Sequence, residues 1–321
     1  MRASSDFRFM IDLTIIIVSW NCRKDLVACL HSIGSSKPDC QYPIVVVDNA
    51  STDGTREEVQ RTFPSVTLVA NPRNLGFAAA NNQALALSRS HYVMLLNPDT
   101  ILRQGAVDVL IRFMDENPTA WVVGPLLLND DGSVQRTGVR FPSLLNLFFE
   151  TFFLDRLFSR SRLFGRHNET YADRSAPHSV DYVQGACMVI RSSALETVGN
   201  LDEQFFMYFE EVDFCFRVAA AGGKVYVCPT SEVVHVGGDV FGHYDERRLE
   251  YYHRSLLRFY RKHLSRVQEV LVRLVLLMRS SIRVVVWWIV AISKPTARIA
   301  AMSCVRGYCR AIVVMVRPRL E

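Results

Sequence analysis

The sequence lacks the cysteine patterns of disulfide-bonded secreted domains and of structural zinc sites. Its eight cysteines include no CxxC pair, and close pairs such as Cys22/Cys29 and Cys304/Cys309 have no zinc-ligand spacing. This pattern predicts reduced thiols in a cytosolic compartment. The N-terminal residues also lack a long apolar core, so we do not expect a secretory signal peptide.

The sequence is also low in charged residues and has no large net charge. Charged residues make up 21% of the chain and hydrophobic residues 49%, which excludes an intrinsically disordered protein. The 321 residues can bury a substantial core in one large domain or two. The net charge of +5 is modest but uneven, because most of the excess base lies from Arg247 onward.

What the first part of the chain does contain is an alternation of β-branched runs and helical stretches. Buried strands are predicted at Leu13–Ser19, Ile44–Val47, Val66–Ala70 and Tyr92–Leu96. Helices are predicted at Arg23–Ile33, from Thr55 onward and at Phe77–Leu87. The order β-α-β-α-β-α-β with short connections predicts an α/β fold with a doubly wound, mostly parallel sheet.

Polar side chains follow the strand Tyr92–Leu96 at the sheet edge where open α/β folds bind ligands. The strand must end there because Pro98 cannot donate to a sheet ladder. Asn97 and Asp99 offer hard oxygens that suit Mg²⁺ or Mn²⁺ bound together with a diphosphate. Asn-Pro and Pro-Asp are also turn dipeptides, so a plain turn is the alternative.

Asp48 comes directly after the strand Ile44–Val47, at the same edge of the predicted sheet. Its carboxylate can accept hydrogen bonds from a nucleotide base or a ribose. The alternative is an Asx-turn or a helix cap, although Asp53 and Thr55 can supply a cap without it. We therefore favour a ligand-binding role for Asp48.

A second acidic cluster consists of Glu210, Glu211 and Asp213, which lie close together among aromatic residues. Desolvation and mutual repulsion there predict raised pKa values. Such tuning suits a general base that takes a proton from a hydroxyl near neutral pH. The alternative is an acidic helix N-terminus favoured by the helix dipole, and both can hold together.

These motifs, in this order, resemble those of family 2 glycosyltransferases with the GT-A fold, in particular the bacterial rhamnosyltransferase-like branch. The resemblance covers about residues 13–262. It rests on VSWN (18–21), VVVDNASTDGT (45–55), NLGFAAANN (74–82), LLNPDT (95–100), GAC (185–187), FFMYFEEVDFCFR (205–217) and VVHVGG (233–238).

The resemblance implies roles for particular residues. Asp99 matches the last carboxylate of the metal-binding DxD motif, which here reads Asn97-Pro98-Asp99, and His235 matches a further metal or diphosphate contact. The general base is implied at Glu211, with Asp213 and Glu210 ranked after it. Residues expected to bind the nucleotide sugar are Ser19, Trp20, Asn21, Asp48, Asn74, Gly76, Asn81 and Asn97.

The implied activity is an inverting, metal-dependent transfer of a sugar from a nucleotide diphosphate sugar. The expected donor is dTDP-rhamnose, with UDP-sugars as the alternative, and the acceptor is a lipid-linked or polysaccharide glycan of the cell surface. One rival is a nucleotidyltransferase, which needs a glycine-rich phosphate loop where Trp20-Asn21-Cys22 stands. The other rival is a catalytically inactive membrane-bound scaffold.

The remaining segments are apolar and basic. Residues 138–180 combine many phenylalanines and leucines with arginines, too dense for a nucleic-acid surface, so we expect a membrane-facing or acceptor-covering segment or a core helix. The expected organisation is a tail at 1–12, a GT-A domain at 13–265 (halves 13–128 and 129–265) and a membrane-associating region at 266–321.

The region after Arg266 repeats arginines along apolar helices. Its longest uncharged run is Val284–Ser293, shorter than the ~20 residues of a spanning helix. A basic stripe with Trp287 and Trp288 instead predicts helices lying in the anionic inner surface of the membrane, with Arg279 among the lipid-binding residues. The alternative is packing against a partner protomer in a homo-oligomer.

Overall fold

The computed structural model describes residues 11–135, 137–158, 161, 163–164, 175–236 and 246–316. The chain divides into two compact units. The first comprises the described residues within Met1–Val139, Asp173–Gln204 and Glu210–Gly238. The second comprises those within Arg140–Ala172, Phe205–Phe209 and Asp239–Glu321. The structure thus groups the helix before residue 266 with the C-terminal region, whereas the sequence organisation separated them.

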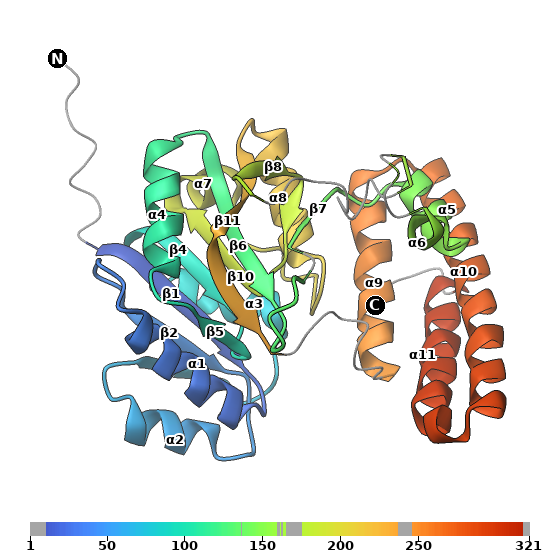
Figure 1. Ribbon diagram of the computed structural model, residues 1–321, viewed down its shortest axis with the longest axis horizontal. Helices are drawn as coiled ribbons and strands as arrows, with labels where there is room; N and C mark the ends of the chain where they lie inside the picture. Colours follow the sequence, from blue (N-terminus) through green and yellow to red (C-terminus); the bar gives the residue numbers. More distant parts are fainter. Residues whose placement is uncertain are drawn as a thin grey trace. The chain divides into compact units, whose positions relative to one another are not determined.

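The first unit is built on a nine-stranded sheet (Figure 1) in the order β3-β2-β1-β4-β10-β6-β11-β5, with β8 also paired to β11. Its strands are β1 (Ile11–Ser19), β2 (Ile44–Asp48), β3 (Thr67–Ala70), β4 (Ser90–Leu96), β5 (Thr100–Leu102), β6 (Ala120–Leu128), β8 (His178–Val180), β10 (Cys187–Arg191) and β11 (Lys224–His235). A separate two-stranded sheet pairs β7 (Gly138–Val139) with β9 (Tyr182–Val183).

The helices of this unit are α1 (Arg23–Ser36), α2 (Thr55–Thr62), α3 (Phe77–Leu85), α4 (Ala106–Glu116), α7 (Ser192–Val198) and α8 (Glu210–Ala220). The four strands β3, β2, β1 and β4 run parallel, as the alternating sequence pattern predicts. Beyond them β10 pairs antiparallel with both β4 and β6, and β11 pairs parallel with β6. The predicted α/β fold with a mostly parallel sheet and flanking helices is confirmed.

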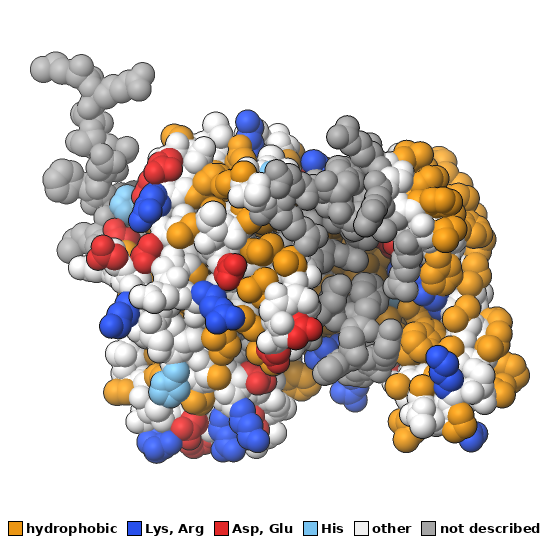
Figure 2. All heavy atoms as spheres, viewed as in Figure 1, with side chains coloured by type: hydrophobic (Ala, Val, Ile, Leu, Met, Phe, Trp, Pro, Cys, Tyr) orange, Lys and Arg blue, Asp and Glu red, His pale blue; other side chains and the backbone are white. Residues whose placement is uncertain are grey.

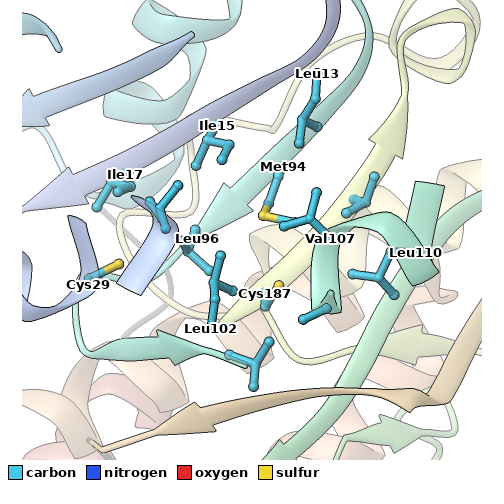
Figure 3. Close-up of a cluster of buried hydrophobic side chains, with 14 of the residues drawn as sticks. Leu13, Ile15, Ile17, Cys29, Met94, Leu96, Leu102, Val107, Leu110 and Cys187 are labelled. Atoms are coloured by element: carbon cyan, nitrogen blue, oxygen red, sulfur yellow. The ribbon is translucent and has the colours of Figure 1, made fainter. Parts of the chain in front are cut away.

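One face of the sheet is covered by α1 and α4, as Figure 3 shows for part of the core. Alternate residues of β1, such as Leu13 and Ile15, point to this face and pack with Met94 of β4 and Leu110 of α4. Each is fully buried, which contributes about 1.5–3 kcal/mol per aliphatic side chain. This packing fixes β1 and β4, and with them the loops at their carboxyl ends.

The second unit is helical, with α5 (Leu144–Thr151), α6 (Leu154–Leu157), α9 (Glu246–His263), α10 (Arg266–Ser293), a 3₁₀ turn at Pro295–Ala297 and α11 (Arg298–Val316). Helix α11 packs against both α9 and α10. The close approach to α9 occurs at Gly307, where a Cβ would lie 2.6 Å from Leu249 Cδ1. Leu249, Cys304 and Tyr308 form a small core here with Trp287 against it.

Helix α10 is mostly apolar on its exposed surface. Between Val267 and Ile292 every exposed residue of this helix is uncharged, and Val267, Leu274 and Trp288 are 72%, 57% and 55% exposed. Figure 2 shows hydrophobic side chains gathered over this helical hairpin. Arg266–Ser293 and Pro295–Val316 are both long and apolar enough to cross a membrane, by length and composition only. The charges on α10 therefore do not exclude a span, contrary to the sequence argument.

The basic stripe predicted along α10 is not an outward surface. Arg279 is 6% exposed, and its Nη1 donates to Glu150 Oε2 on α5 at 2.9 Å. Arg273 binds Glu269 and the carbonyl of Met315, while the Arg283 guanidinium lies 4.1 Å from the Phe153 ring centroid. The expectation that Arg279 binds lipid headgroups is wrong, because α5 supplies a carboxylate that draws it inward.

Candidate functional site

Three loops meet at the carboxyl edge of the parallel strands, as the sequence predicts. Ser19 pairs with Asp48 across β1 and β2, and Ile17 pairs with Leu96 across β1 and β4. Asn49 N donates to the carbonyl of Ser19 at 2.8 Å, which ties the first two loops together. The loops after Ser19, Asp48 and Leu96 therefore lie side by side at one edge of the sheet.

Asp48 is fully buried at this edge. Its Oδ2 accepts a hydrogen bond from Arg56 Nε at 2.5 Å and one from Ser51 N at 3.2 Å. Arg56 Nη2 also donates to the carbonyl of Asn71 at 2.5 Å, and a third of the arginine side chain is exposed. The Asp48 carboxylate thus forms an ion pair and a local turn contact. The group here that reaches solvent is Arg56, which the sequence pattern did not identify.

An amide network missed by the sequence reading holds the loop between β3 and α3. Asn49 Nδ2 donates to the carbonyl of Gly76 at 3.0 Å, and its Oδ1 accepts from Asn71 Nδ2 at 3.0 Å. Asn71 in turn exchanges hydrogen bonds with Gln83 of α3. Asn49 is 2% exposed and Asn71 is 4% exposed. Their positions directly after β2 and β3 are the signal that could have identified them.

The other predicted nucleotide-binding residues occupy different environments. Trp20 is half exposed beside Asn21, whose Oδ1 accepts from Thr52 N at 2.8 Å. Asn74 Oδ1 accepts from Gly76 N at 2.9 Å. Asn81 is 1% exposed and donates to its own helix at the Phe77 carbonyl, so its amide lies inside α3. Ser19 is buried, with its Oγ 3.2 Å from Cys22 Sγ.

Asp99 and His235 are brought together by the pairing of β5 with β11, in which His235 lies opposite Thr100. His235 Nε2 lies 3.4 Å from Asp99 Oδ1. On the other side of the ring, His235 Nδ1 lies 3.0 Å from Gln135 Oε1. Gln135 is held in turn, because its Nε2 donates to the His235 carbonyl and to Asn129 Oδ1.

This arrangement fits a divalent cation. An amide oxygen only accepts, so Nδ1 must carry the proton that it shares with Gln135, and a neutral His235 presents the lone pair of Nε2 towards Asp99. A ligating histidine is commonly oriented by such a second hydrogen bond.

Among the described residues no three His, Cys, Asp or Glu side chains cluster as a complete metal site. Two protein ligands suit a metal that also takes oxygens from a diphosphate. Gly237 and Gly238, part of the motif around His235, lie outside the described residues.

The three carboxylates of α8 have separate environments. Asp213 is fully buried and accepts from Arg217 Nε at 2.9 Å, while Arg217 also donates to the carbonyls of Val198 and Asn200. Glu210 is 5% exposed, and burial together with the neighbouring Glu211 carboxylate raises its pKa well above the ordinary value. Glu211 is the partly exposed member of the trio.

The acidic cluster and the Asp99 loop are linked through residues 185–187. Asn97 N donates to the carbonyl of Ala186 at 2.8 Å, and Leu96 pairs with Cys187 in the sheet. A Cβ placed on Gly185 would lie 3.7 Å from Glu211 Cγ. Glu211 therefore lies next to the short segment that carries the Asn97 hydrogen bond.

Asp99 and His235 thus meet at the carboxyl edge of an α/β sheet, and the acidic cluster of α8 is joined to the same loop through residues 185–187. Residues 14–199 match the family model described as glycosyl transferase family 2. The chain belongs to this family of glycosyltransferases, and the resemblance inferred from the motifs is confirmed.

Similar proteins agree with this membership. The chain is 29% identical over 258 residues to the N-acetylglucosaminyl-diphospho-decaprenol L-rhamnosyltransferase of Mycobacterium tuberculosis, covering 77% of this chain and 83% of that one. It is 25% identical to rhamnosyltransferase WbbL of Escherichia coli, covering 73% and 84%. The mannosyltransferase PcManGT of Pyrobaculum calidifontis, solved with GDP-Man and Mn²⁺, shares the fold at 16% identity, with a TM-score of 0.58 and coverage of 96% and 89%.

Proposed function

We propose that this protein transfers a rhamnosyl group from dTDP-rhamnose to a lipid-linked glycan acceptor, in one displacement with inversion at the anomeric carbon. The acceptor oxygen forms the new bond to the anomeric carbon while the bond to the diphosphate breaks on the opposite face. The proton of the acceptor hydroxyl passes to a carboxylate, and the nucleoside diphosphate leaves. UDP-sugars are the alternative donors.

The observation that carries this proposal is the link between Glu211 and the Asp99 loop through Gly185 and Ala186. A base for the acceptor and a site for the leaving diphosphate have to lie on either side of one reacting carbon. The Asn97–Ala186 hydrogen bond joins the two groups through backbone rather than through mobile side chains. Such a connection favours a fixed distance between base and leaving group.

Glu211 is the general base in this proposal. Asp213 is fully buried and its charge is taken up by Arg217, so it serves the structure of α8. Glu210 is buried and its pKa is raised by that burial, so it does not ionise readily. Glu211, in the first turn of α8, is the least buried of the three carboxylates, and the helix dipole favours an acid at this end of the helix.

Asp99 and His235 would hold Mn²⁺ or Mg²⁺ with the donor diphosphate. The bound ion would neutralise charge that develops on the leaving diphosphate. The chain's own contribution is orientation, since Gln135 holds the His235 ring with Nε2 towards Asp99. At the nucleotide end, Arg56 on Asp48 and the amide network of Asn49 and Asn71 would shape the base pocket.

The donor and the acceptor are inferred from relatives. Rhamnosyltransferases of two bacteria resemble the chain over more than two thirds of its length. The mycobacterial relative is named for a diphospho-decaprenol substrate, which is a lipid. This supports a rhamnosyl donor and an acceptor held at a membrane.

We infer a membrane location on the cytoplasmic side, and helix α10 supports the membrane part of this inference. Most of its exposed residues between Val267 and Ile292 are apolar, while Arg273 and Arg279 are held by polar groups of the protein, which is the reverse of a helix on a water-soluble protein. A coiled-coil partner would meet charged residues beside the apolar seam, but exposed neighbours such as Val270 and Ile289 are apolar too. We therefore infer that this face lies in lipid hydrocarbon rather than against a second copy.

The test is transfer from a panel of nucleotide sugars to a lipid-linked N-acetylglucosaminyl diphosphate, with Mn²⁺ and membrane vesicles. We expect turnover with dTDP-rhamnose and an inverted anomeric configuration in the product. Glu211→Gln should lower kcat by ~10²–10⁴-fold while donor binding persists. Absence of turnover with every donor would overturn the proposed function, and full activity of Glu211→Gln would overturn the base assignment.

A further inference from the structure

Arg56 joins the ends of two neighbouring strands of the sheet. Its Nε donates to Asp48 Oδ2 at the end of β2, and its Nη2 donates to the carbonyl of Asn71 directly after β3. The two strands are in register here, because Asp48 pairs with Ala70 and Asn71 N donates to the Asp48 carbonyl at 2.9 Å. The guanidinium is therefore fixed across the carboxyl ends of β2 and β3, where the loops of the candidate site meet.

The Asp48 carboxylate is occupied by this arrangement. Its side chain is 0% exposed. Its two oxygens lie 3.4 and 3.2 Å from Ser51 N, and Oδ2 lies 2.5 Å from Arg56 Nε. An ionised carboxylate only accepts hydrogen bonds, and a buried one needs the partners that it has. Asp48 therefore holds the arginine, and its own side chain is not open to a ligand.

The Arg56 guanidinium has a donor that the protein does not use. A third of the side chain is exposed, and its hydrogen bonds to described residues use Nε and Nη2 but not Nη1. A guanidinium has five N–H donors and no acceptor, so Nη1 offers hydrogen bonds only to acceptor atoms. Because the other two nitrogens are already held, little side-chain freedom remains to be lost when a ligand binds.

The place of Arg56 in the sheet suits the base of a nucleotide whose diphosphate lies at Asp99. Strand β2, which ends in Asp48, is separated from β4, which precedes Asp99, by β1 alone. Two strand spacings correspond to roughly 10 Å. The ribose of a nucleotide spans a separation of this kind between base and diphosphate. Thymine and uracil each carry two carbonyl oxygens, which are the acceptors that Nη1 requires.

We propose that Arg56 binds the base of the donor nucleotide by donating an Nη1 hydrogen bond to a carbonyl oxygen of thymine or uracil, and that Asp48 is the residue that positions it. This inference rests on the proposed nucleotide diphosphate sugar donor. It reverses the direction of the hydrogen bond expected from the sequence, in which the Asp48 carboxylate accepts a hydrogen bond from the base.

The test is binding to the full-length protein, measured by calorimetry with Mn²⁺ and two probes, dTDP and inorganic pyrophosphate. Arg56→Ala should weaken dTDP binding by ~10–100-fold, as expected for the loss of a hydrogen bond from a charged donor. Pyrophosphate binding should be unchanged, because this probe has no base. UDP has the same two carbonyl oxygens and should lose affinity as dTDP does.

Arg61→Ala is the matched control. Arg61 lies on the same helix and pairs with Glu58 at 2.6 Å, but its side chain is 73% exposed. Its removal changes the net charge equally and should leave the binding of both probes unchanged. Arg56→Lys keeps a cation beside Asp48 and covers the case in which Arg56→Ala does not fold. This variant should also lose dTDP affinity, because an ammonium lacks the planar fork that reaches Asp48 and the base together.

The outcomes distinguish this inference from the proposed function. Unchanged or tighter dTDP binding in the Arg56 variants would overturn it, since the uncovered Asp48 carboxylate would then be the group that binds the base. An equal loss of pyrophosphate binding would also overturn it, since the arginine would then act on the diphosphate. A loss confined to dTDP and UDP supports it. If the unchanged protein binds neither nucleotide, the proposed donor is wrong instead.

Discussion

The ion pair between Glu150 and Arg279 should be the main polar support of α10. The two side chains are 19% and 7% exposed, and the Nη1–Oε2 distance is 2.9 Å. Glu150→Gln removes the charge and leaves the guanidinium buried without its carboxylate. Breaking a buried pair from one side costs roughly 3–5 kcal/mol, because the remaining charge is no longer compensated.

The matched control is Glu250→Gln on α9. Glu250 pairs with Arg254 at 2.9 Å, a similar distance, but the side chains are 24% and 31% exposed. An exposed pair of this kind contributes about 0–1 kcal/mol. Glu250 also lies 3.7 Å from Arg310, which is half exposed, so the comparison sets one buried pair against a more exposed pair of contacts.

The assay is equilibrium unfolding in urea, followed by the fluorescence of Trp287, which packs on the core between α9 and α11. The double substitution Glu150→Leu with Arg279→Met should recover most of the loss, since apolar residues of similar size replace buried pairs at little cost. If Glu150→Gln is no more destabilising than Glu250→Gln, Arg279 is not held by α5. If Arg279→Met loses salt-sensitive vesicle binding at unchanged stability, Arg279 binds lipid headgroups after all.

Three further predictions concern the site and the helical unit. Asp99→Asn should abolish turnover and Mn²⁺-dependent donor binding in a thermal-shift assay. An active variant would show that Asn97-Pro98-Asp99 is a plain turn without a metal-binding role. Gly185→Leu should lower kcat at unchanged thermal stability, because even a Cβ there lies 3.7 Å from Glu211 Cγ; Gly185→Ala, in ordinary contact, should retain most activity. Burial lowers the pKa of His253 from 6.5 to about 4, so between these values the unfolded chain binds a proton that the folded chain does not. Stability should therefore fall by roughly 3 kcal/mol as pH drops through this window, and unfolding of His253→Phe should lack that dependence.

The parallel half of the sheet could be predicted because its strands are short, apolar and β-branched. The predicted Leu13–Ser19 and Ile44–Val47 lie within β1 and β2, which differ from them by one or two residues at their ends. The antiparallel insertion of β10 between β4 and β6 could not be predicted. Its position depends on pairing with residues far away in the chain, such as Ile190 with Val93 and Val122, and such registers leave no local periodicity.

Asp99 was predicted as a metal ligand from its residue type and position, and His235 from the family resemblance, but their proximity was not predicted. Asp99 and His235 are separated by about half of the first unit and meet because β5 pairs with β11. Gln135, which orients His235, lies in a turn region without any recognisable motif. A sequence pattern identifies a ligand that follows a strand, whereas the residue that orients it is chosen by tertiary contact.

Asp48 illustrates why the two interpretations of a motif need not exclude each other. The sequence offered a ligand for the nucleotide or a local turn, and the structure gives the carboxylate a turn contact to Ser51 and an ion pair to Arg56. Arg56 lies eight residues away, in the first turn of α2, so no spacing rule connects it with a strand end. A fully buried carboxylate cannot itself meet a base without moving, but it can hold a guanidinium whose exposed third remains free to do so. In that case Arg56 would contact the nucleotide, and Asp48 would position the Arg56 guanidinium without contacting the nucleotide itself.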